Sequence, residues 1–145
     1  MVLGIGNSLR GDDALGLEIL KLLRGKVPRS VKLIESGTMP ENFTDEVKLL
    51  KPSHVLLIDA TSSNAEPGVV RLVRPEDIDG LVVSAHALPL SMFAEVVQKS
   101  VEAKVLLLGV QPKIVEFAEG LTPEVEKAVE KVAEKLARLL VEVCV

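Results

Sequence analysis

The sequence predicts an α/β protein, a three-layer α/β/α sandwich around a mostly parallel, twisted sheet of five strands. Short apolar runs alternate with stretches in which apolar residues recur at helical spacing. The chain has 145 residues, of which 48% are hydrophobic, and this is enough for one domain with one core. No linker or repeat interrupts the alternation, so we expect a single domain over residues 1–145.

The chain opens on a strand, a polar turn and a helix. Residues 2–5 predict a strand covered on both faces, and the glycines at 4 and 6 let the backbone turn sharply. Beyond Asp12 and Asp13, apolar residues at 15, 19, 22 and 23 lie on one helical face. We therefore expect one or both aspartates at a helix N-terminus, where free N–H groups favour a carboxylate. Taken alone, these residues favour two helix-capping acids.

Four further strands complete the predicted sheet. Residues 31–35, 54–59 and 104–110 are apolar runs typical of buried strands, and the run HVLLID at 54–59 fits a central position. Residues 69–73 follow a turn too short to hold a crossover helix, which leaves an antiparallel edge position open to this strand. Residues 81–84 are expected to be extended.

Three more helices are expected, over 41–50, over 89–102 and from Thr122 onward. Thr122 is predicted to be the N-cap of the last helix, with Pro123 at its first helical position. Its apolar residues form a stripe at helical spacing: Val125, Val129, Val132, Leu136, Leu139, Leu140 and Val143. We expect this stripe to pack on the core and the intervening Glu and Lys residues to be solvated.

Charge and composition exclude several classes of function. The formal net charge of -4 gives no basic surface field, which argues against nucleic acid as a partner and against electrostatic membrane binding. No run of 18 apolar residues could span a bilayer, and the first strand begins at once, leaving no room for a signal peptide. A cytoplasmic protein is therefore expected. The single cysteine, Cys144, excludes an internal disulfide and a thiolate metal cluster.

Three candidate functional residues follow strands, at the sheet edge where α/β proteins place their sites. They are Asp13 after the first strand, Asp59 at the end of the third, and His86 in SAHALPL. Asp59 could instead cap a turn, and His86 could be a core histidine bonded to a carbonyl. Together, two carboxylates and one imidazole would form an open ligand set for a divalent metal. His54 precedes its strand and is left out.

A nucleotide-binding interpretation of the opening turn fails on the residues. Gly4 and Gly6 begin like the dinucleotide fingerprint, but Leu9 occupies the position of the third glycine. The chain also lacks a glycine-rich loop ending in Lys-Ser or Lys-Thr and a Gly-x-Ser-x-Gly nucleophile motif.

Five segments, in order, cover nearly the whole chain and carry a resemblance to a known family. They are GIGNSLRGDDALG, ESGTMPEN, LLIDAT, HALPL and LLGVQPKIVEFAEGLTPEV. They resemble the motifs of the endopeptidases that mature the large subunit of nickel-iron hydrogenases, and the last two are most similar to the formate hydrogenlyase-type hydrogenase 3 branch. Ala14 departs from the family, which usually has Gly there. The change is harmless in a helical backbone and strained in a left-handed one.

The resemblance implies roles for individual residues. Asp13 and Asp59 match the metal-contacting carboxylates and His86 the imidazole ligand, and these three are also the implied catalytic residues; Asp12 is the weaker candidate. The metal is nickel already held by the hydrogenase large-subunit precursor, so the free enzyme is either metal-free or binds another divalent ion. The enzyme would recognise this nickel before removing a C-terminal extension.

The chemistry and the class of function leave alternatives open. Nickel could act as a Lewis acid, or it could only position the chain while an aspartate serves as general base. A non-catalytic nickel carrier or chaperone could use the same three ligands. A small amidase or nucleoside-processing enzyme is disfavoured, because the chain has no Trp or Tyr for base stacking. We also expect Gly37 and Thr38 either to line a groove for the substrate tail or to form a plain turn, and the protein to be a monomer or weak oligomer.

Overall fold

The computed structural model describes residues 1–83 and 89–144. Its strands are β1 (Val2–Ile5), β2 (Leu33–Gly37), β3 (His54–Ser62), β4 (Val70–Val73), β5 (Val82–Val83) and β6 (Lys104–Val110). Its α-helices are α1 (Leu15–Leu23), α2 (Thr44–Leu50), α3 (Leu90–Val101) and α4 (Pro123–Val143). Three short 3-10 helices accompany them: η1 (Gly11–Ala14), η2 (Pro40–Phe43) and η3 (Pro75–Gly80).

The sheet has the strand order β2-β1-β3-β6-β4 within the described residues. The first four strands of this order are parallel, and β4 pairs antiparallel with β6 at the edge. The short β5 pairs antiparallel with the last residues of β3. The predicted five-stranded, mostly parallel sheet with an antiparallel edge strand is confirmed, and β3 lies at its centre as expected.

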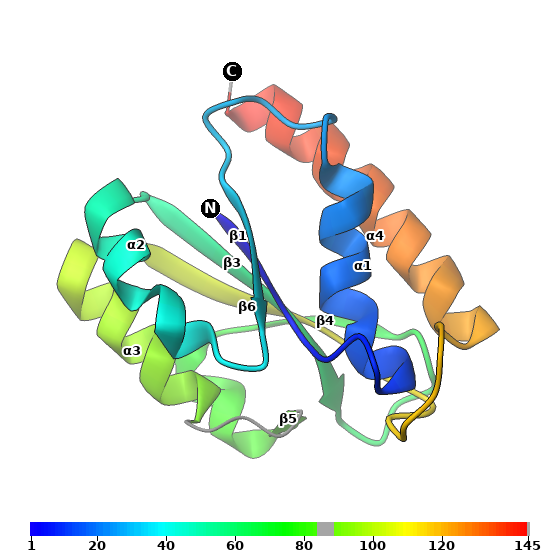
Figure 1. The fold of residues 1–145 in the computed structure, drawn as a ribbon. Helices are drawn as coiled ribbons and strands as arrows, with labels where there is room; N and C mark the ends of the chain where they lie inside the picture. The colour runs from blue at the N-terminus through cyan, green and yellow to red at the C-terminus, as the bar shows by residue number, and fades with distance from the viewer. Residues whose placement is uncertain (84–88, 145) are drawn as a thin grey trace.

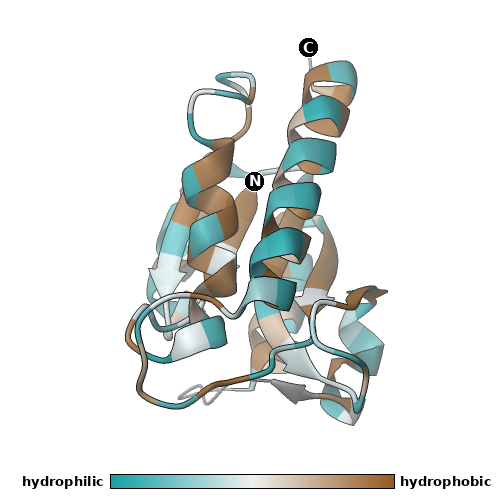
Figure 2. Ribbon diagram, turned by 90° about the vertical axis from the view of Figure 1, so that its right-hand side faces the viewer, coloured by the Kyte–Doolittle hydropathy of each residue, from teal (hydrophilic) through white to brown (hydrophobic). Residues whose placement is uncertain are grey.

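Helices cover both faces of the sheet, which gives the three predicted layers (Figure 1). On one face, α1 and α4 pack over a core cluster that includes Leu15, Ile19, Ile58, Val129 and Val132. On the other face, α2 and α3 pack over a second cluster, which includes Leu3, Val47, Leu57, Phe93 and Val97. The side of α4 turned to the viewer in Figure 2 is mainly hydrophilic, in keeping with a solvated face. Within the described residues, no helix is both long enough and apolar enough to cross a bilayer.

Several predicted boundaries are wrong. β3 continues to Ser62, so Asp59 lies inside the strand and not at its tip. The strand is longer because pairing with β6 extends to Ala60, and Thr61 and Ser62 pair with β5. The helix predicted over 41–50 divides into η2 and α2. The strand predicted at 31–35 is shifted to β2.

The last helix departs from prediction at both ends. Thr122 lies at the N-cap position with an extended backbone, and Pro123 follows at the first helical position as expected. The Thr122 side chain makes no capping hydrogen bond, because its hydroxyl is bonded to Asp12 instead. The apolar stripe is buried as far as Leu136, whereas Leu139 and Val143 are exposed.

Candidate functional site

Both aspartates of the opening turn lie in η1, which is seated on the carboxyl ends of β1 and β3. A Cβ added to Gly16 would lie 2.5 Å from the carbonyl oxygens of both Ile5 and Ile58. A Cβ added to Gly6 would lie 2.0 Å from the carbonyl oxygen of Asp13. Only glycine permits these approaches. The glycines at 6 and 16 therefore allow η1 and the start of α1 to pack closely against the edge of the sheet.

Asp12 is fully buried and serves as an anchor for a distant loop. Its Oδ2 accepts hydrogen bonds from the backbone N–H of Lys113 (2.9 Å) and of Ile114 (3.0 Å) and from the Thr122 hydroxyl (2.8 Å). Its Oδ1 accepts from the Thr122 backbone N–H at 2.7 Å. Four donors satisfy both carboxylate oxygens, and they fix the segment between β6 and α4 to η1.

Backbone hydrogen bonds reinforce this attachment. Asp12 N–H donates to Ile114 O at 2.8 Å, Gly11 N–H donates to Ala118 O at 3.0 Å, and Ala118 N–H donates to Leu9 O at 3.1 Å. At the far side of the loop, Lys113 pairs with Glu124 at 2.9 Å, and this hydrogen bond lowers the pKa of Glu124. Asp12 and Asp13 lie in the first turn of η1, at a helix start as expected. The capping interpretation that these residues favour when taken alone does not hold for Asp12, whose carboxylate binds the β6–α4 loop.

Asp13 is almost fully buried but is incompletely hydrogen-bonded. Its Oδ2 accepts from the Asn7 backbone N–H at 3.1 Å, so this carboxylate does not cap a helix either. Its Oδ1 is buried and has no hydrogen-bond partner in the described structure. A buried carboxylate oxygen without a donor is unfavourable, so Asp13 is poised to gain from a cation or proton donor that enters the site.

Asp59 lies at the same end of the sheet. It is fully buried, and its Oδ1 accepts from the Ala60 backbone N–H at 2.8 Å. It directly follows Ile58, the last β3 residue that pairs with β1 and the residue whose carbonyl contacts Gly16. The structure therefore brings Asp13 and Asp59 to one sheet edge, as predicted.

His86 lies outside the described residues, so the structure does not test its predicted place as the third ligand. Before this segment, the chain runs through β5, where Val83 pairs with Thr61, two residues beyond Asp59. The described residues contain no group of three His, Cys, Asp or Glu side chains arranged to hold a metal ion. The predicted ligand set needs His86 and stays a prediction.

Two other expectations concern the backbone around the site. Ala14 has φ -78° and ψ -6°, an ordinary right-handed conformation, so alanine is unstrained where the family usually has glycine. Gly37 has φ +62° and accepts a hydrogen bond from the Gly6 N–H at 2.9 Å. Gly37 is thus the last residue of β2, beside the opening turn, and its role in a substrate groove stays a prediction.

Sequence reasoning missed the anchoring role of Asp12 and the structural role of Gln111. Gln111 follows β6, and its Oε1 accepts from the Ser63 backbone N–H at 2.8 Å. Its Nε2 donates to Pro112 O at 3.2 Å. This side chain ties the end of β6 to the chain leaving β3. A glutamine between a buried strand and a proline was the available signal.

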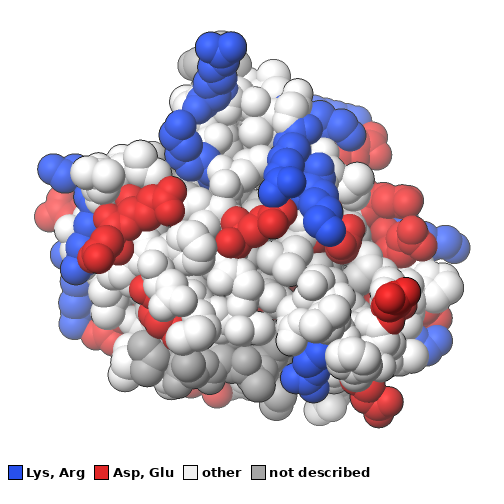
Figure 3. Space-filling model, in the orientation of Figure 1, with Lys and Arg blue, Asp and Glu red and all other residues white. Residues whose placement is uncertain are grey.

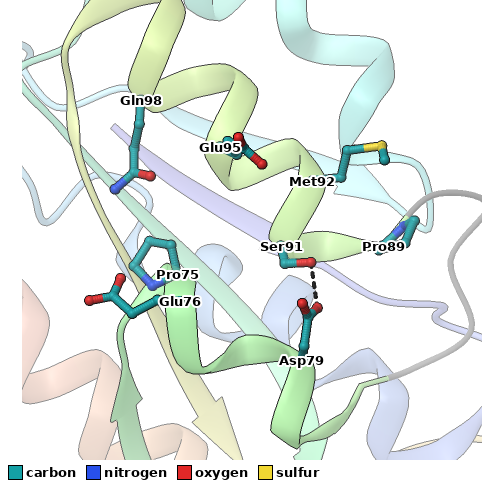
Figure 4. A pocket seen from close by; sticks show the side chains of 8 residues that line it. All are labelled: Pro75, Glu76, Asp79, Pro89, Ser91, Met92, Glu95 and Gln98. Atoms are coloured by element: carbon teal, nitrogen blue, oxygen red, sulfur yellow. Dashed lines mark hydrogen bonds between the residues drawn. The ribbon is translucent and has the colours of Figure 1, made fainter.

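The described residues also line cavities away from the two aspartates. One of about 550 Å³ lies between η3 and α3 and is lined by Pro75, Glu76, Asp79, Pro89, Ser91, Met92, Glu95 and Gln98 (Figure 4). Within it, the Ser91 hydroxyl donates to Asp79 Oδ1 at 2.5 Å. Asp13 and Asp59 do not line this cavity. Basic and acidic side chains are interspersed on the face shown in Figure 3.

Sequence comparisons find relatives that match nearly the whole chain. The family model described as hydrogenase maturation protease matches residues 18–139. A putative hydrogenase maturation protease of Methanocaldococcus jannaschii is 34% identical over 150 aligned positions, covering 98% of this chain and 88% of that protein. The hydrogenase 3 maturation protease of Escherichia coli K12 is 31% identical over 137 positions, covering 94% and 87%.

Comparisons of structure agree with those of sequence. The crystal structure of a [NiFe] hydrogenase maturation protease, HycI, from Thermococcus kodakarensis superposes with a TM-score of 0.85 at 29% identity, covering 96% of this chain and 90% of that one. The solution structure of the endopeptidase HycI from Escherichia coli gives a TM-score of 0.84 at 30% identity, covering 95% and 88%.

Proposed function

The chain belongs to the hydrogenase maturation protease family, and we propose that it removes the C-terminal extension from the nickel-loaded precursor of a nickel-iron hydrogenase large subunit. Family membership makes it an endopeptidase of hydrogenase maturation. Our proposal adds the recognition of precursor-held nickel through Asp13, Asp59 and His86. It also adds hydrolysis of an aspartic or metal-dependent type, a cytoplasmic location, and action as a monomer or weak oligomer.

One observation carries the assignment of Asp13. Its Oδ1 is buried without a donor among residues 1–83 and 89–144, whereas the oxygens of Asp12, the preceding residue, accept four hydrogen bonds. A cation that approached Asp12 would compete with these bonds, but at Asp13 Oδ1 it would supply a missing partner. Asp13 is therefore the better metal contact of the pair.

The chemistry of the three residues suits a divalent ion. Carboxylates and imidazole bind such ions, and three protein ligands leave positions for substrate. In the proposal, nickel is part of the substrate, and it supplies positive charge near the peptide bond to be cut. Asp13, Asp59 and His86 then orient the precursor, so that a precursor lacking nickel is discriminated against. The free protein needs no metal of its own under this scheme.

The test is mass spectrometry of the cognate large-subunit precursor, nickel-loaded and nickel-free, after incubation with the protein. We expect loss of a C-terminal peptide only from the nickel-loaded precursor. Asp13→Asn, Asp59→Asn and His86→Ala should leave the precursor intact. Glu18→Gln is the matched control, because it removes a more exposed carboxylate of the neighbouring helix and should cleave like the unmodified protein.

Two results would contradict the proposal. If nickel-free precursor were cleaved as fast as nickel-loaded precursor, the protein would not recognise nickel. Intact precursor in every reaction, with nickel loading verified, would favour the non-catalytic nickel carrier. Replacing nickel in the precursor by another divalent ion separates the two mechanisms, because kcat should change if the ion is a Lewis acid, and mainly KM if it only positions the chain.

A further inference from the structure

We propose that an apolar ridge on the β6–α4 loop and the opening turn is the surface on which the precursor protein docks. The ridge consists of Leu9, Ile114, Val115 and Phe117. The inference rests on the proposed function and extends it, because it assigns the contact that holds the folded substrate while its tail reaches Asp13.

All four side chains of the ridge are exposed. Phe117 is 84% exposed and Leu9 is 57% exposed, and Ile114 and Val115 are also exposed. Phe117 stands apart from the other two phenylalanines, because Phe93 is buried in the core and Phe43 packs partly against it. Large apolar side chains gathered on a surface are typical of a protein contact, whereas scattered ones need no explanation.

The ridge is also held in place. Asp12 fixes the loop through Lys113, Ile114 and Thr122, and the backbone of Ala118 bonds to both Leu9 and Gly11. These bonds place residues 114–118 alongside residues 9–12, as the loop beside the opening turn in Figure 1 shows. A pre-ordered surface loses less conformational entropy on binding than a free loop would. The buried carboxylate of Asp12 thus holds an exposed surface in a fixed conformation.

The position of the ridge selects its partner. Ile114 O is bonded to Asp12 N–H, and Asp13 follows directly with an oxygen that has no partner among the described residues. The ridge therefore adjoins the residue that the substrate tail reaches in the proposed function. A second copy of this chain is the alternative occupant, but nothing in its own surface would bring it to Asp13, whereas the precursor must reach that residue under the proposed function.

The surrounding charges agree with a protein partner of mixed character. Arg10, Glu116 and Glu119 adjoin the ridge, and Lys113 is paired with Glu124. Neither sign dominates, so the ridge offers apolar contact with a mixed polar rim, as protein interfaces do. We therefore assign it to a folded precursor and not to a polyanion.

Phe117→Ser tests the ridge, with Phe117→Leu as the conservative variant. Leu49→Ser is the matched control, because Leu49 is 81% exposed in α2, outside the ridge. We expect Phe117→Ser to weaken equilibrium binding of nickel-free precursor about tenfold and to raise KM for nickel-loaded precursor similarly, with kcat unchanged. Phe117→Leu and Leu49→Ser should stay within about twofold of the unmodified protein.

The outcomes separate this inference from the proposed function. If Phe117→Ser binds precursor as tightly as Leu49→Ser does, docking on the ridge is refuted even when cleavage is normal. If the unmodified protein fails to cleave but Phe117→Ser still weakens binding, the ridge stands and the proposed function fails. A homodimer in sedimentation that Phe117→Ser dissociates would assign the ridge to a second copy and overturn the proposal.

Discussion

The two ends of the sheet differ in whether their ionisable side chains are buried or exposed. At the carboxyl end, Asp12, Asp13 and Asp59 are at most 2% exposed. At the amino end, His54 and Lys104 are exposed, and the His54 ring shares a hydrogen bond with the neighbouring Ser53 hydroxyl at 2.9 Å. Burying a carboxylate is unfavourable unless its oxygens are satisfied. The buried carboxylates are concentrated at the end of the sheet where the proposed site lies.

Within the carboxyl end, the neighbours Asp12 and Asp13 differ in the same way. Asp12 accepts four hydrogen bonds and holds a loop, whereas Asp13 has a buried oxygen to which none of the described residues donates. Adjacent identical residues thus have separate tasks, one structural and one available for a ligand. The predictions below test this contrast, in order of their expected effect on the free energy of unfolding.

Asp12→Ala should have the largest effect. Removing the carboxylate leaves the backbone N–H groups of Lys113, Ile114 and Thr122 without their acceptor, and we expect a loss of about 3 kcal/mol or more. Urea unfolding followed by circular dichroism measures it. Asp12→Asn should lose less, because one amide oxygen can still accept. Equal stability of Asp12→Ala and the unmodified protein would refute the anchor.

Gly16→Ala should come next. Its Cβ would meet the carbonyl oxygens of Ile5 and Ile58, so α1 must move away from the sheet, at about 1–3 kcal/mol. Gly80→Ala is the control, because nothing in the described structure lies within 4 Å of a Cβ there. Thermal unfolding of the two variants compares them. A Gly16→Ala protein as stable as Gly80→Ala would contradict the close seating of η1.

Asp13→Asn should change stability little while abolishing cleavage. The amide is nearly isosteric, can still accept from the Asn7 N–H, and removes an incompletely satisfied buried charge. We expect the free energy of unfolding to stay within about 1 kcal/mol of the unmodified value, or to rise. The same urea titration decides it. Destabilisation as severe as that of Asp12→Ala would show that Asp13 is also an anchor.

His54→Gln should have the smallest effect. The ring lies at the amino end and its side-chain bond is to an exposed serine, so we expect a change below about 0.5 kcal/mol and unaltered cleavage of the precursor. Parallel unfolding and cleavage assays measure both quantities. A marked loss of cleavage would place a functional residue at the end of the sheet that this account assigns to structure alone.

Most of the fold could be predicted from local sequence patterns. Apolar runs identified the strands, and β6 was predicted at its observed bounds, because a short, nearly continuous apolar run between Lys104 and Gln111 has few alternatives. The same logic placed Asp13 and Asp59 toward the carboxyl ends of parallel strands, since Asp13 follows β1 and Asp59 lies in the second half of β3, although not at its tip as predicted. The end of β3 was missed because Thr61 and Ser62 pair with β5, a contact between segments about 20 residues apart.

The different roles of Asp12 and Asp13 could not be predicted from local sequence patterns. Near η1 both residues are acids in a helix start, and propensity treats them alike. Their difference arises from Lys113, Ile114 and Thr122, which are about 100 residues away. Thr122 is a related case. Its residue type and position are those of an N-cap, but its hydroxyl donates to Asp12 instead of capping the helix. Tertiary contacts decided both cases.

The most direct test of the central claim is the equilibrium affinity of the protein for nickel-loaded and nickel-free precursor, measured with unmodified protein and with Asp13→Asn at low temperature before cleavage. The account predicts that unmodified protein binds the nickel-loaded form at least about tenfold more tightly, and that Asp13→Asn loses this preference. An Asp13→Asn protein that keeps the full preference for nickel would contradict the assignment of Asp13 as the nickel contact.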